Sequence, residues 1–564
     1  MNTDNESVNE SVLQAIRRLE KSILEDGKVD KAETELLLRF AKPLAATNSD
    51  MADFVRALED VRADGIITPD ESIRIGAHLK WLARETSPVE PDKGFLGRLF
   101  KLNRNRTTVR TESVAGITTF MTMAYILAVN PNILSDAGIP RGGVFVATAV
   151  AAVIGTLLMA FMSNYPFVLA PGMGLNAFLT YSVVLGMGYS WQFALLAVFV
   201  EGLIFLALSL TPVREGIFNA IPISLKKAVS AGIGLYICLI AMKTAGIVVD
   251  NQATLVAMVS FKDVSFHTHG ICALLALAGT VFTSFLLVKG WKGAILLGIL
   301  FTWGLGIVAQ ACGIYVPDPA AKFFSLYPDF SFQGLAQNFS EFGQTIGAIF
   351  NPAGWSHGTG ETMRSGWTLV TSLDFFVVMF AFFFVDLFDT LGTLIGVSMK
   401  GGFLDKEGKL PRISGALCAD AIATATGAVL GTSTTTTYVE SASGVMAGGK
   451  TGLTAVTSAA FFAIAILFAP VFLAIPGFAT APALIVVGYM MLSSCSDIDW
   501  RDAGDAVPAF LAIVAMPFTY SISDGIMFGV ISYTVINLLA RNFKKIHWVM
   551  YILTVVFIAK YALM

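Results

Sequence analysis

The sequence predicts an all-α polytopic membrane protein, and three properties of the chain indicate this class. Of its 564 residues, 55% are hydrophobic and 14% are charged, whereas a soluble domain carries about 25% charged residues. The hydrophobic residues form many runs of about 20 residues, the length at which a helix spans the hydrocarbon core of a bilayer. The apolar runs predict that the chain lies in the lipid bilayer, and the net charge of −3 suggests neither a nucleic-acid partner nor a polybasic lipid anchor.

Residues 1–96 are charged and lack a long apolar run, and we expect a small soluble helical accessory domain there. Within it, Glu25–Glu33 and Ala63–Glu71 share the pattern Asp-Gly-x-hydrophobic-x-x-x-Glu. The second copy is EF-hand-like, but Arg62 stands where an oxygen ligand is expected, and the first copy departs further from the pattern. Since calcium takes six or more oxygen ligands, we expect no metal there. The repeat also resembles tellurite-resistance TerB-like domains.

Residues 97–564 form the predicted transmembrane domain, which begins with a basic hinge at 97–110. Its five Lys and Arg residues stand just before the first span and therefore place the N-terminal segment in the cytoplasm. Two sets of seven spans are expected. They lie near 114–134, 142–163, 168–186, 190–211, 224–247, 270–288 and 293–312, and near 371–398, 413–431, 435–450, 452–474, 476–495, 506–521 and 523–541.

The cations of the loops agree with this count, because cytoplasmic loops are enriched in Lys and Arg. Lys226 and Lys227 follow the fourth span, and Lys289 and Lys292 follow the sixth, both on the expected cytoplasmic side. An odd number of spans in each half predicts that the two halves are inverted repeats of each other. The apolar stretch 547–564 either lies in the interface or makes an additional crossing.

The third span of each half is interrupted. In the first half, the segment APGMG (170–174) interrupts it, and in the second half GTSTTTTYVESASGVMAGGK (431–450) changes from a β-branched run to small residues. Both segments predict a short strand followed by a helix whose first N–H groups are free. Interrupted spans at matching places in two halves indicate the substrate site of a transporter. The alternative is a polar loop with Glu440 as its helix N-cap.

Four polar residues within the spans are the candidate site residues, namely Asn176, Asp386, Asp389 and Glu440. Ionisable groups at membrane depth are costly, and by default they indicate a functional site. Apart from Lys450 at the far end of its span, these segments contain no Lys or Arg, so we expect one carboxyl group to carry a proton. Asp386 and Asp389 share one helical face; the alternative is one functional and one structural acid.

Carboxylates, an amide and open helix ends suit a small planar ligand with alternating donors and acceptors, as in neutral purines. Phe178 and Phe388 could stack on such a ligand, although packing is the expected role of most phenylalanines in a chain that has 43. For Glu201, Asp374 and Asp420 a structural role is expected. The cysteines and histidines show no metal-ligand spacing, so we expect no metal and no cofactor.

Four motifs in order resemble those of the AzgA-like adenine/guanine/hypoxanthine permeases, a branch of the nucleobase–cation symporter-2 group with the xanthine/uracil permease fold. They are TTFMTMAYILAVNP (118–131), APGMGLNAF (170–178), VDLFDTLGTLIG (385–396) and GTSTTTTYVESASGV (431–445). The resemblance implies a core domain that holds the substrate between spans three, eight and ten, and a gate domain through which a homodimer can form.

The same resemblance implies the roles of individual residues. The expected purine contacts are Asn176, Asp386, Val439 and Glu440, and the residues expected to couple transport to protons are Glu440, Asp386 and Asp389. The sequence thus predicts a proton-coupled purine nucleobase importer of the cell inner membrane, not an enzyme. A sulfate or dicarboxylate transporter of the same fold is the alternative, but no cation faces the predicted acidic site. An intramembrane aspartyl enzyme is a further alternative, and its YD…GxGD pairing is missing.

Overall fold

The structure is a computed structural model that describes residues 31–42, 54–56, 58–59, 75, 92, 94–210, 222–251, 254–261, 264–267, 269–291, 293–317, 324–328, 332–358, 364–405 and 410–563. In the predicted accessory domain it describes helix α2 (Lys31–Ala41). Ala63–Glu71 and most of Glu25–Glu33 lie outside the described residues, so the TerB-like or EF-hand-like domain stays a prediction. A short helix, α5 (Gly94–Phe100), precedes the transmembrane part.

The first seven predicted spans are all present as helical segments, and the third is interrupted as expected. In order they are α6 (Val109–Met123) with α7 (Ile126–Asp136), α8 (Arg141–Met162), β1 (Leu169–Pro171) with α9 (Met173–Ala177) and the π-helical segment η2 (Phe178–Gly186), α10 (Trp191–Ser209), α12 (Ile223–Thr244), α13 (His269–Val288) and α14 (Ala294–Ala311).

The second seven follow the same plan, with the interruption again in the third. They are α17 (Leu373–Gly401), α18 (Ile413–Leu430), β6 (Thr435–Thr437) with α19 (Ser441–Met446), α20 (Gly452–Ala465) with α21 (Ala469–Ala474), α22 (Gly477–Leu492), α23 (Ala503–Thr519) and α24 (Ile522–Leu539). Among the described residues, ten helical stretches are long and apolar enough to cross a membrane, and four shorter apolar ones accompany them. One of the shorter ones is α25 (Trp548–Leu563), the last apolar stretch, which packs against α24.

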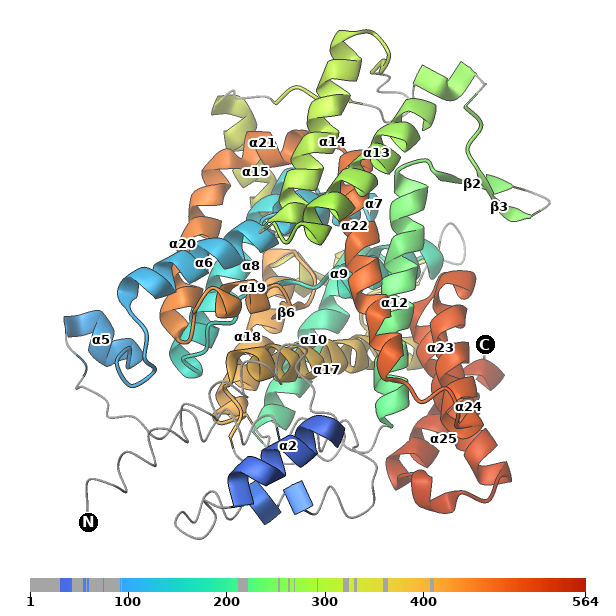
Figure 1. Cartoon of the computed structure of the whole chain (residues 1–564). Coiled ribbons are helices and arrows are strands. Elements are labelled where there is room, and N and C mark those ends of the chain that lie inside the picture. Colours follow the sequence, from blue (N-terminus) through green and yellow to red (C-terminus); the bar gives the residue numbers. More distant parts are fainter. Residues whose placement is uncertain are drawn as a thin grey trace.

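A polar segment between the halves covers one end of the first group of helices. Its elements are α15 (Phe332–Thr345), η5 (Ala348–Phe350), η6 (Pro352–Gly354), β4 (Ser356–His357), β5 (Arg364–Ser365) and α16 (Trp367–Val370). Helix α15 packs on α8, and the Glu341 carboxylate accepts a hydrogen bond from the Gly142 N–H at the start of α8, at 2.8 Å. A hairpin of β2 (Val248–Asn251) and β3 (Leu255–Met258) projects after α12 (Figure 1).

The helices pack in two groups, each built from both halves of the chain. In one group, α8 contacts α7, α18 and α20, and α10 contacts α17 and α18. In the other, α12 packs against α22 and α23, and α13 against α14 and α22. Contacts between the groups include those of α12 with α9 and α17. We call the first group the core domain and the second group the gate domain.

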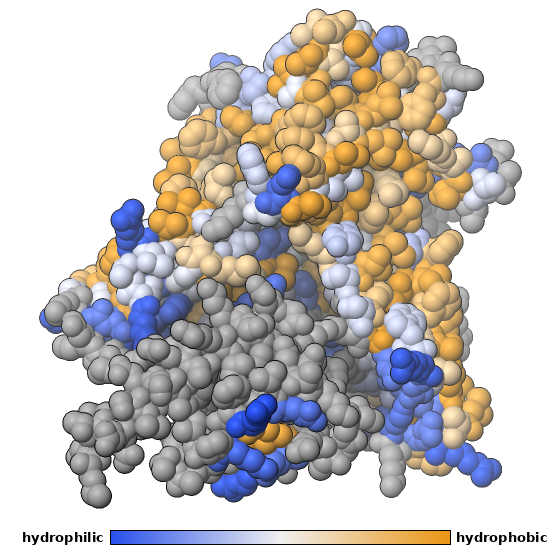
Figure 2. Space-filling view, viewed as in Figure 1, coloured by the Kyte–Doolittle hydropathy of each residue, from blue (hydrophilic) through white to orange (hydrophobic). Residues whose placement is uncertain are grey.

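The surface of the described part agrees with a membrane location. Figure 2 shows hydrophobic residues over α13 and α14, while hydrophilic residues gather toward the lower edge of the view. Large apolar side chains such as Val281 (71% exposed), Val288 (86%) and Leu467 (68%) point outward. Since large exposed apolar surfaces are rare on soluble monomers, this surface is the one expected to face lipid.

Candidate functional site

The two interrupted spans meet at the centre of the core domain. Strand β1 pairs antiparallel with β6, with Leu169 opposite Thr437, Ala170 opposite Thr436 and Pro171 opposite Thr435. The run from Thr432 to Thr437 is buried throughout, at 0–1% exposure. β-Branched residues favour strands. Backbone N–H and C=O groups at membrane depth need hydrogen-bond partners within the protein, and here each strand supplies the partners of the other. Helices α9 and α19 therefore begin close to this strand pair (Figure 1).

Glu440 lies at the start of α19 and faces the break in the first span. It occupies the N-cap position, but its side chain makes no capping hydrogen bond, so the alternative of a capping carboxylate does not describe its role. Instead its Oε1 accepts a hydrogen bond from the Tyr125 hydroxyl at 2.7 Å. Glu440 is partly exposed, and Val439 before it is 52% exposed, in contrast to the buried strand residues.

Asp386 is fully buried inside the core domain. Its Oδ1 lies 3.2 Å from the Thr390 hydroxyl, which also lies 2.8 Å from Oδ2 of Asp420 and 2.6 Å from the Thr436 hydroxyl. The Glu201 carboxyl, on α10, faces Asp386 from another side. Asp386 thus belongs to a buried group of acids and hydroxyls behind the strand pair, contributed by α10, α17, α18 and β6.

Asp389, one turn further along α17, is in a different environment. It is partly exposed, and its charge interacts with those of Asp420 and Glu440. Its Oδ2 lies beside the turn between β1 and α9, 3.8 Å from where a Cβ would stand on Gly172. The structure therefore brings the Asp389 carboxyl near that of Glu440, beside the turn between β1 and α9.

Asn176, on α9, is fully buried. Its Oδ1 accepts a hydrogen bond from the Ser433 hydroxyl, which joins the two interrupted spans. Its Nδ2 has no hydrogen-bond partner among the described residues. A buried polar group without a partner costs free energy, which makes this amide a candidate ligand contact.

An open face runs from the two partly exposed acids along α17 and α19. On α17, a Cβ added at Gly392 or Gly396 would meet nothing within 4 Å. On α19, Ser443 is partly exposed and Met446 is 75% exposed. Carboxylates at membrane depth face protein or water and not lipid, so this open face is the side from which a ligand is expected to approach the two acids.

Asp420, near the middle of α18, joins this helix to strand β6. Its Oδ1 accepts hydrogen bonds from the N–H and the hydroxyl of Thr437, at 3.0 and 3.1 Å. The structural role expected for Asp420 therefore agrees with its contacts. Phe178 is buried and packs edge-on against Phe382, which is a packing role. The side chains of Phe388 and Asp374 lie outside the described residues.

Tyr125 and Thr390 are the residues that sequence reasoning missed. Both stand in the quoted motifs, Tyr125 in TTFMTMAYILAVNP and Thr390 in VDLFDTLGTLIG. The available sequence signal was a hydroxyl-bearing residue within an apolar span. The hydrogen bond of Tyr125 joins it to a residue 315 positions away, and no local sequence pattern can indicate such a contact.

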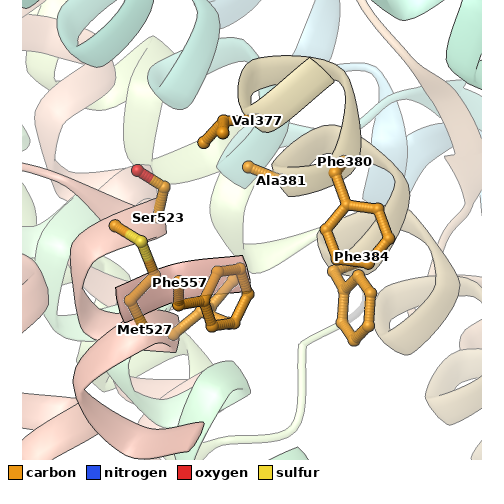
Figure 3. A pocket seen from close by; sticks show the side chains of 8 residues that line it. Val377, Phe380, Ala381, Phe384, Ser523, Met527 and Phe557 are labelled. Atoms are coloured by element: carbon orange, nitrogen blue, oxygen red, sulfur yellow. The ribbon is translucent and has the colours of Figure 1, made fainter. Parts of the chain in front are cut away.

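An apolar cavity elsewhere lies between α17, α24 and α25 (Figure 3). It is lined by Val377, Phe380, Ala381, Phe384, Ser523, Ile526, Met527 and Phe557. The Ser523 hydroxyl is the polar side-chain group of this lining, and no lining residue is titratable. This cavity therefore lacks the chemistry of the strand crossing, which remains the candidate site.

Known proteins resemble this chain in both sequence and fold. A sequence profile of the Permease family, of the xanthine/uracil type, matches residues 110–528. The chain is 40% identical over 465 residues to the guanine/hypoxanthine permease PbuO of Bacillus subtilis, covering 81% of this chain and 98% of that protein. It is 38% identical over 476 residues to the adenine permease AdeQ of Escherichia coli, covering 84% and 98%.

Solved structures show the same fold at low sequence identity. The transmembrane domain of the cyanobacterial bicarbonate transporter BicA matches with a TM-score of 0.51 and 14% identity, covering 76% of this chain and 98% of that one. The murine anion transporter Slc26a9 in its inward-facing state matches with a TM-score of 0.50 and 14% identity, covering 81% and 74%. The predicted fold of two inverted seven-span repeats is thereby confirmed.

Proposed function

Because the chain belongs to the Permease family of the xanthine/uracil type, we propose that it imports purine nucleobases together with protons. The family assignment makes the protein a transporter and not an enzyme. Relatives named as guanine/hypoxanthine and adenine permeases, at 38–40% identity over most of their length, support adenine, guanine or hypoxanthine as the substrate.

The observation that carries this proposal is the pair of partly exposed carboxylates, Asp389 and Glu440, beside the crossing of β1 and β6. Purine bases present ring N–H and exocyclic amino donors, and two carboxylates can accept from both. Buried donor–acceptor matching of this kind discriminates strongly against ligands that lack the donors. An anion would instead meet two negative charges, which disfavours sulfate, dicarboxylate or bicarbonate at this position.

The contacts divide the predicted residues into two roles. Asp389 and Glu440 accept hydrogen bonds from the purine, and the free Nδ2 of Asn176 donates to a ring nitrogen or a carbonyl oxygen. Val439 borders the open face beside Glu440 and contributes apolar contact and backbone. This assignment places Asp389 where the sequence resemblance placed Asp386, because Asp386 is fully buried behind the strand pair.

Asp386 is the residue that we assign to proton coupling. The Thr390 hydroxyl has one proton, yet it lies within hydrogen-bond distance of Asp386, Asp420 and Thr436. If Asp386 and Asp420 were both ionised, the single Thr390 proton could serve only one of the two carboxylates. The Glu201 carboxyl also faces Asp386 and is a third acid in this group. A proton on Asp386 satisfies Thr390 and removes one buried charge, which is costly without a partner.

Transport then follows from movement of the core domain against the gate domain. A proton reaches the buried acids from outside, the purine binds at the strand crossing, and the moving core exposes both to the cytoplasm along the open face that carries Gly392 and Ser443. The bacterial-type inner membrane, the cytoplasmic N-terminal segment and a homodimer through the gate domain are parts of the same proposal. They are supported by the positive-inside distribution of cations and by the fold.

Uptake of labelled purines tests the proposal in cells that lack purine permeases of their own. Wild-type protein should accumulate labelled hypoxanthine, guanine or adenine chemically unchanged, and accumulation should collapse when a protonophore is added. Glu440→Gln and Asp389→Asn should each abolish uptake while the protein remains in the membrane. Glu341→Gln, on the outer helix α15, is the matched control. Normal uptake in both site variants, or competition by sulfate but not by purines, would refute the proposal.

A further inference from the structure

The first span changes from α6 to α7 beside the proposed substrate site, and threonine side chains precede this junction. Three threonine hydroxyls in α6 donate to backbone carbonyls within the helix, Thr118 to Val114, Thr119 to Ala115 and Thr122 to Thr119, at 2.8–3.0 Å. Such back-bonding by Ser and Thr bends helices. The helix ends at Met123, and α7 begins at Ile126, so that Tyr125 stands at this junction.

Tyr125 is held in one position by its surroundings. Its side chain is fully buried, and its hydroxyl donates to Oε1 of Glu440 at 2.7 Å. The two helices that carry these residues pack closely, since a Cβ added at Gly444 of α19 would lie 2.9 Å from the carbonyl oxygen of Ala115. Both partners therefore stand at the ends of helical segments that belong to closely packed spans.

We propose that Tyr125 is a positioning residue for purine binding, which fixes the Glu440 carboxylate in the orientation that accepts the nucleobase. A glutamate side chain has three freely rotating bonds, and ordering it on binding lowers affinity. The Tyr125 hydroxyl orders it beforehand by occupying Oε1, which leaves Oε2 to accept a hydrogen bond from the ligand. Such preorganisation increases affinity without any contact between the positioning group and the ligand.

This inference rests on the proposed function, because it takes Glu440 to be a purine contact. It goes beyond that function by assigning a role to a residue of span one, which lies outside the three spans expected to hold substrate.

Transport kinetics of Tyr125→Phe separate a positioning role from a structural one. The variant keeps the buried ring and loses the hydroxyl, so the protein should fold and reach the membrane. We expect KM for the purine to rise about tenfold, the factor for losing one hydrogen bond to a charged group, with Vmax within about twofold of wild type. Tyr315→Phe is the matched control, because it removes a hydroxyl that donates to the Phe324 carbonyl at 2.8 Å far from the site.

A spectroscopic measurement on purified protein tests the contact itself. The infrared carboxylate band that disappears in Glu440→Gln should be displaced in Tyr125→Phe and unchanged in Tyr315→Phe. An unchanged KM together with an unchanged band would overturn the positioning role of Tyr125 while leaving purine transport intact. Normal uptake in Glu440→Gln would instead overturn the proposed site, and with it this inference.

Discussion

Asp386 and Asp389 lie three residues apart on α17, yet their carboxyl groups enter different environments. Asp386 is completely buried against Thr390 and faces Glu201, whereas Asp389 is partly exposed beside Gly172 and interacts with Glu440. Residues three apart in an α-helix differ by about 60° around the axis, which is enough to direct one acid into the core domain and the other toward the open face. In our proposal, this division separates proton coupling from substrate contact.

The two acids should therefore respond differently to neutralisation. Asp389→Asn should lose purine binding, with Kd raised about 100-fold or more. Asp386→Asn should keep Kd within about threefold, because Asn can still accept from Thr390, but it cannot release a proton. We expect this variant to exchange purine in counterflow and to fail in accumulation driven by a proton gradient. Gradient-driven accumulation at the wild-type level in Asp386→Asn would contradict its assigned role.

The close approach of α19 to α6 should be essential for transport. A Cβ on Gly444 would lie 2.9 Å from the Ala115 carbonyl oxygen and closer still to the Thr119 hydroxyl. Gly444→Ala should push α19 away and separate Glu440 from Tyr125, which we expect to reduce uptake at least tenfold. Gly304→Ala on α14 is the control, since nothing lies within 4 Å of the added methyl group. Equal uptake by the two variants would show that the helix spacing is unimportant.

Glu112 should contribute to stability and not to substrate recognition. It is fully buried, and its carboxylate accepts hydrogen bonds from Lys450 N–H at 2.9 Å and from the hydroxyls of Thr451 and Thr454 at 2.9 and 2.7 Å. It thereby joins α6 to the start of α20. Glu112→Gln turns an amide N–H2 toward groups that are themselves donors, and it should lower the free energy of unfolding by about 1–3 kcal/mol.

Thermal unfolding in detergent measures that cost as a lower apparent Tm. Glu341→Gln is the control, because this carboxylate receives the Gly142 N–H at a partly exposed position and its loss should change Tm less. KM of Glu112→Gln should stay near the wild-type value. A variant with wild-type Tm and a strongly raised KM would contradict the structural role.

The surface ion pair between Lys545 and Asp502 makes the stability of the protein depend on pH. The hydrogen bond from Lys545 holds the pKa of Asp502 below its ordinary value of 3.8, helped by the Gly504 N–H. The same contact raises the pKa of Lys545 above 10.5. The stabilisation is therefore present at neutral pH, is lost as pH falls through the lowered pKa of Asp502, and is lost again as pH rises through the raised pKa of Lys545.

The size of this effect should be small, because both side chains are about 40% exposed and such pairs contribute about 0.2–1 kcal/mol. Asp502→Asn keeps the capping of α23, since Asn caps helices as well as Asp, and removes the charge. Its Tm should be slightly below wild type at pH 7, and the difference should shrink as pH falls below the ordinary pKa of 3.8 toward the lowered pKa of Asp502. A difference that grows toward pH 3 would contradict this account.

The sequence predicted the spans and the two short strands because their signals are local, but it did not predict that the strands pair. Apolar length gives each span, and the β-branched run before Glu440 gives β6. It could not predict the hydrogen bond between Tyr125 and Glu440, which depends on how two distant helices pack. The sequence analysis placed the start of the first span at residue 114. In the structure α6 begins at Val109, and Glu112 is buried inside the packed helices.

The different environments of Asp386 and Asp389 could not be predicted from local sequence either. Helical spacing puts both on one side of α17, and the neighbours that distinguish them, Glu201 and Gly172, come from other spans. Which acid meets the purine therefore depends on the tertiary arrangement of α10 and α9 around α17, and periodicity carries no information about it.

Counterflow in proteoliposomes tests the central claim most directly, because it needs only purified protein, lipid and substrate. Vesicles preloaded with unlabelled purine should take up labelled hypoxanthine, guanine or adenine through the wild-type protein. Excess external purine should block this signal, sulfate and bicarbonate should not, and Glu440→Gln should give none. Counterflow at the wild-type level in Glu440→Gln, or transport of sulfate or bicarbonate in place of purines, would contradict the account.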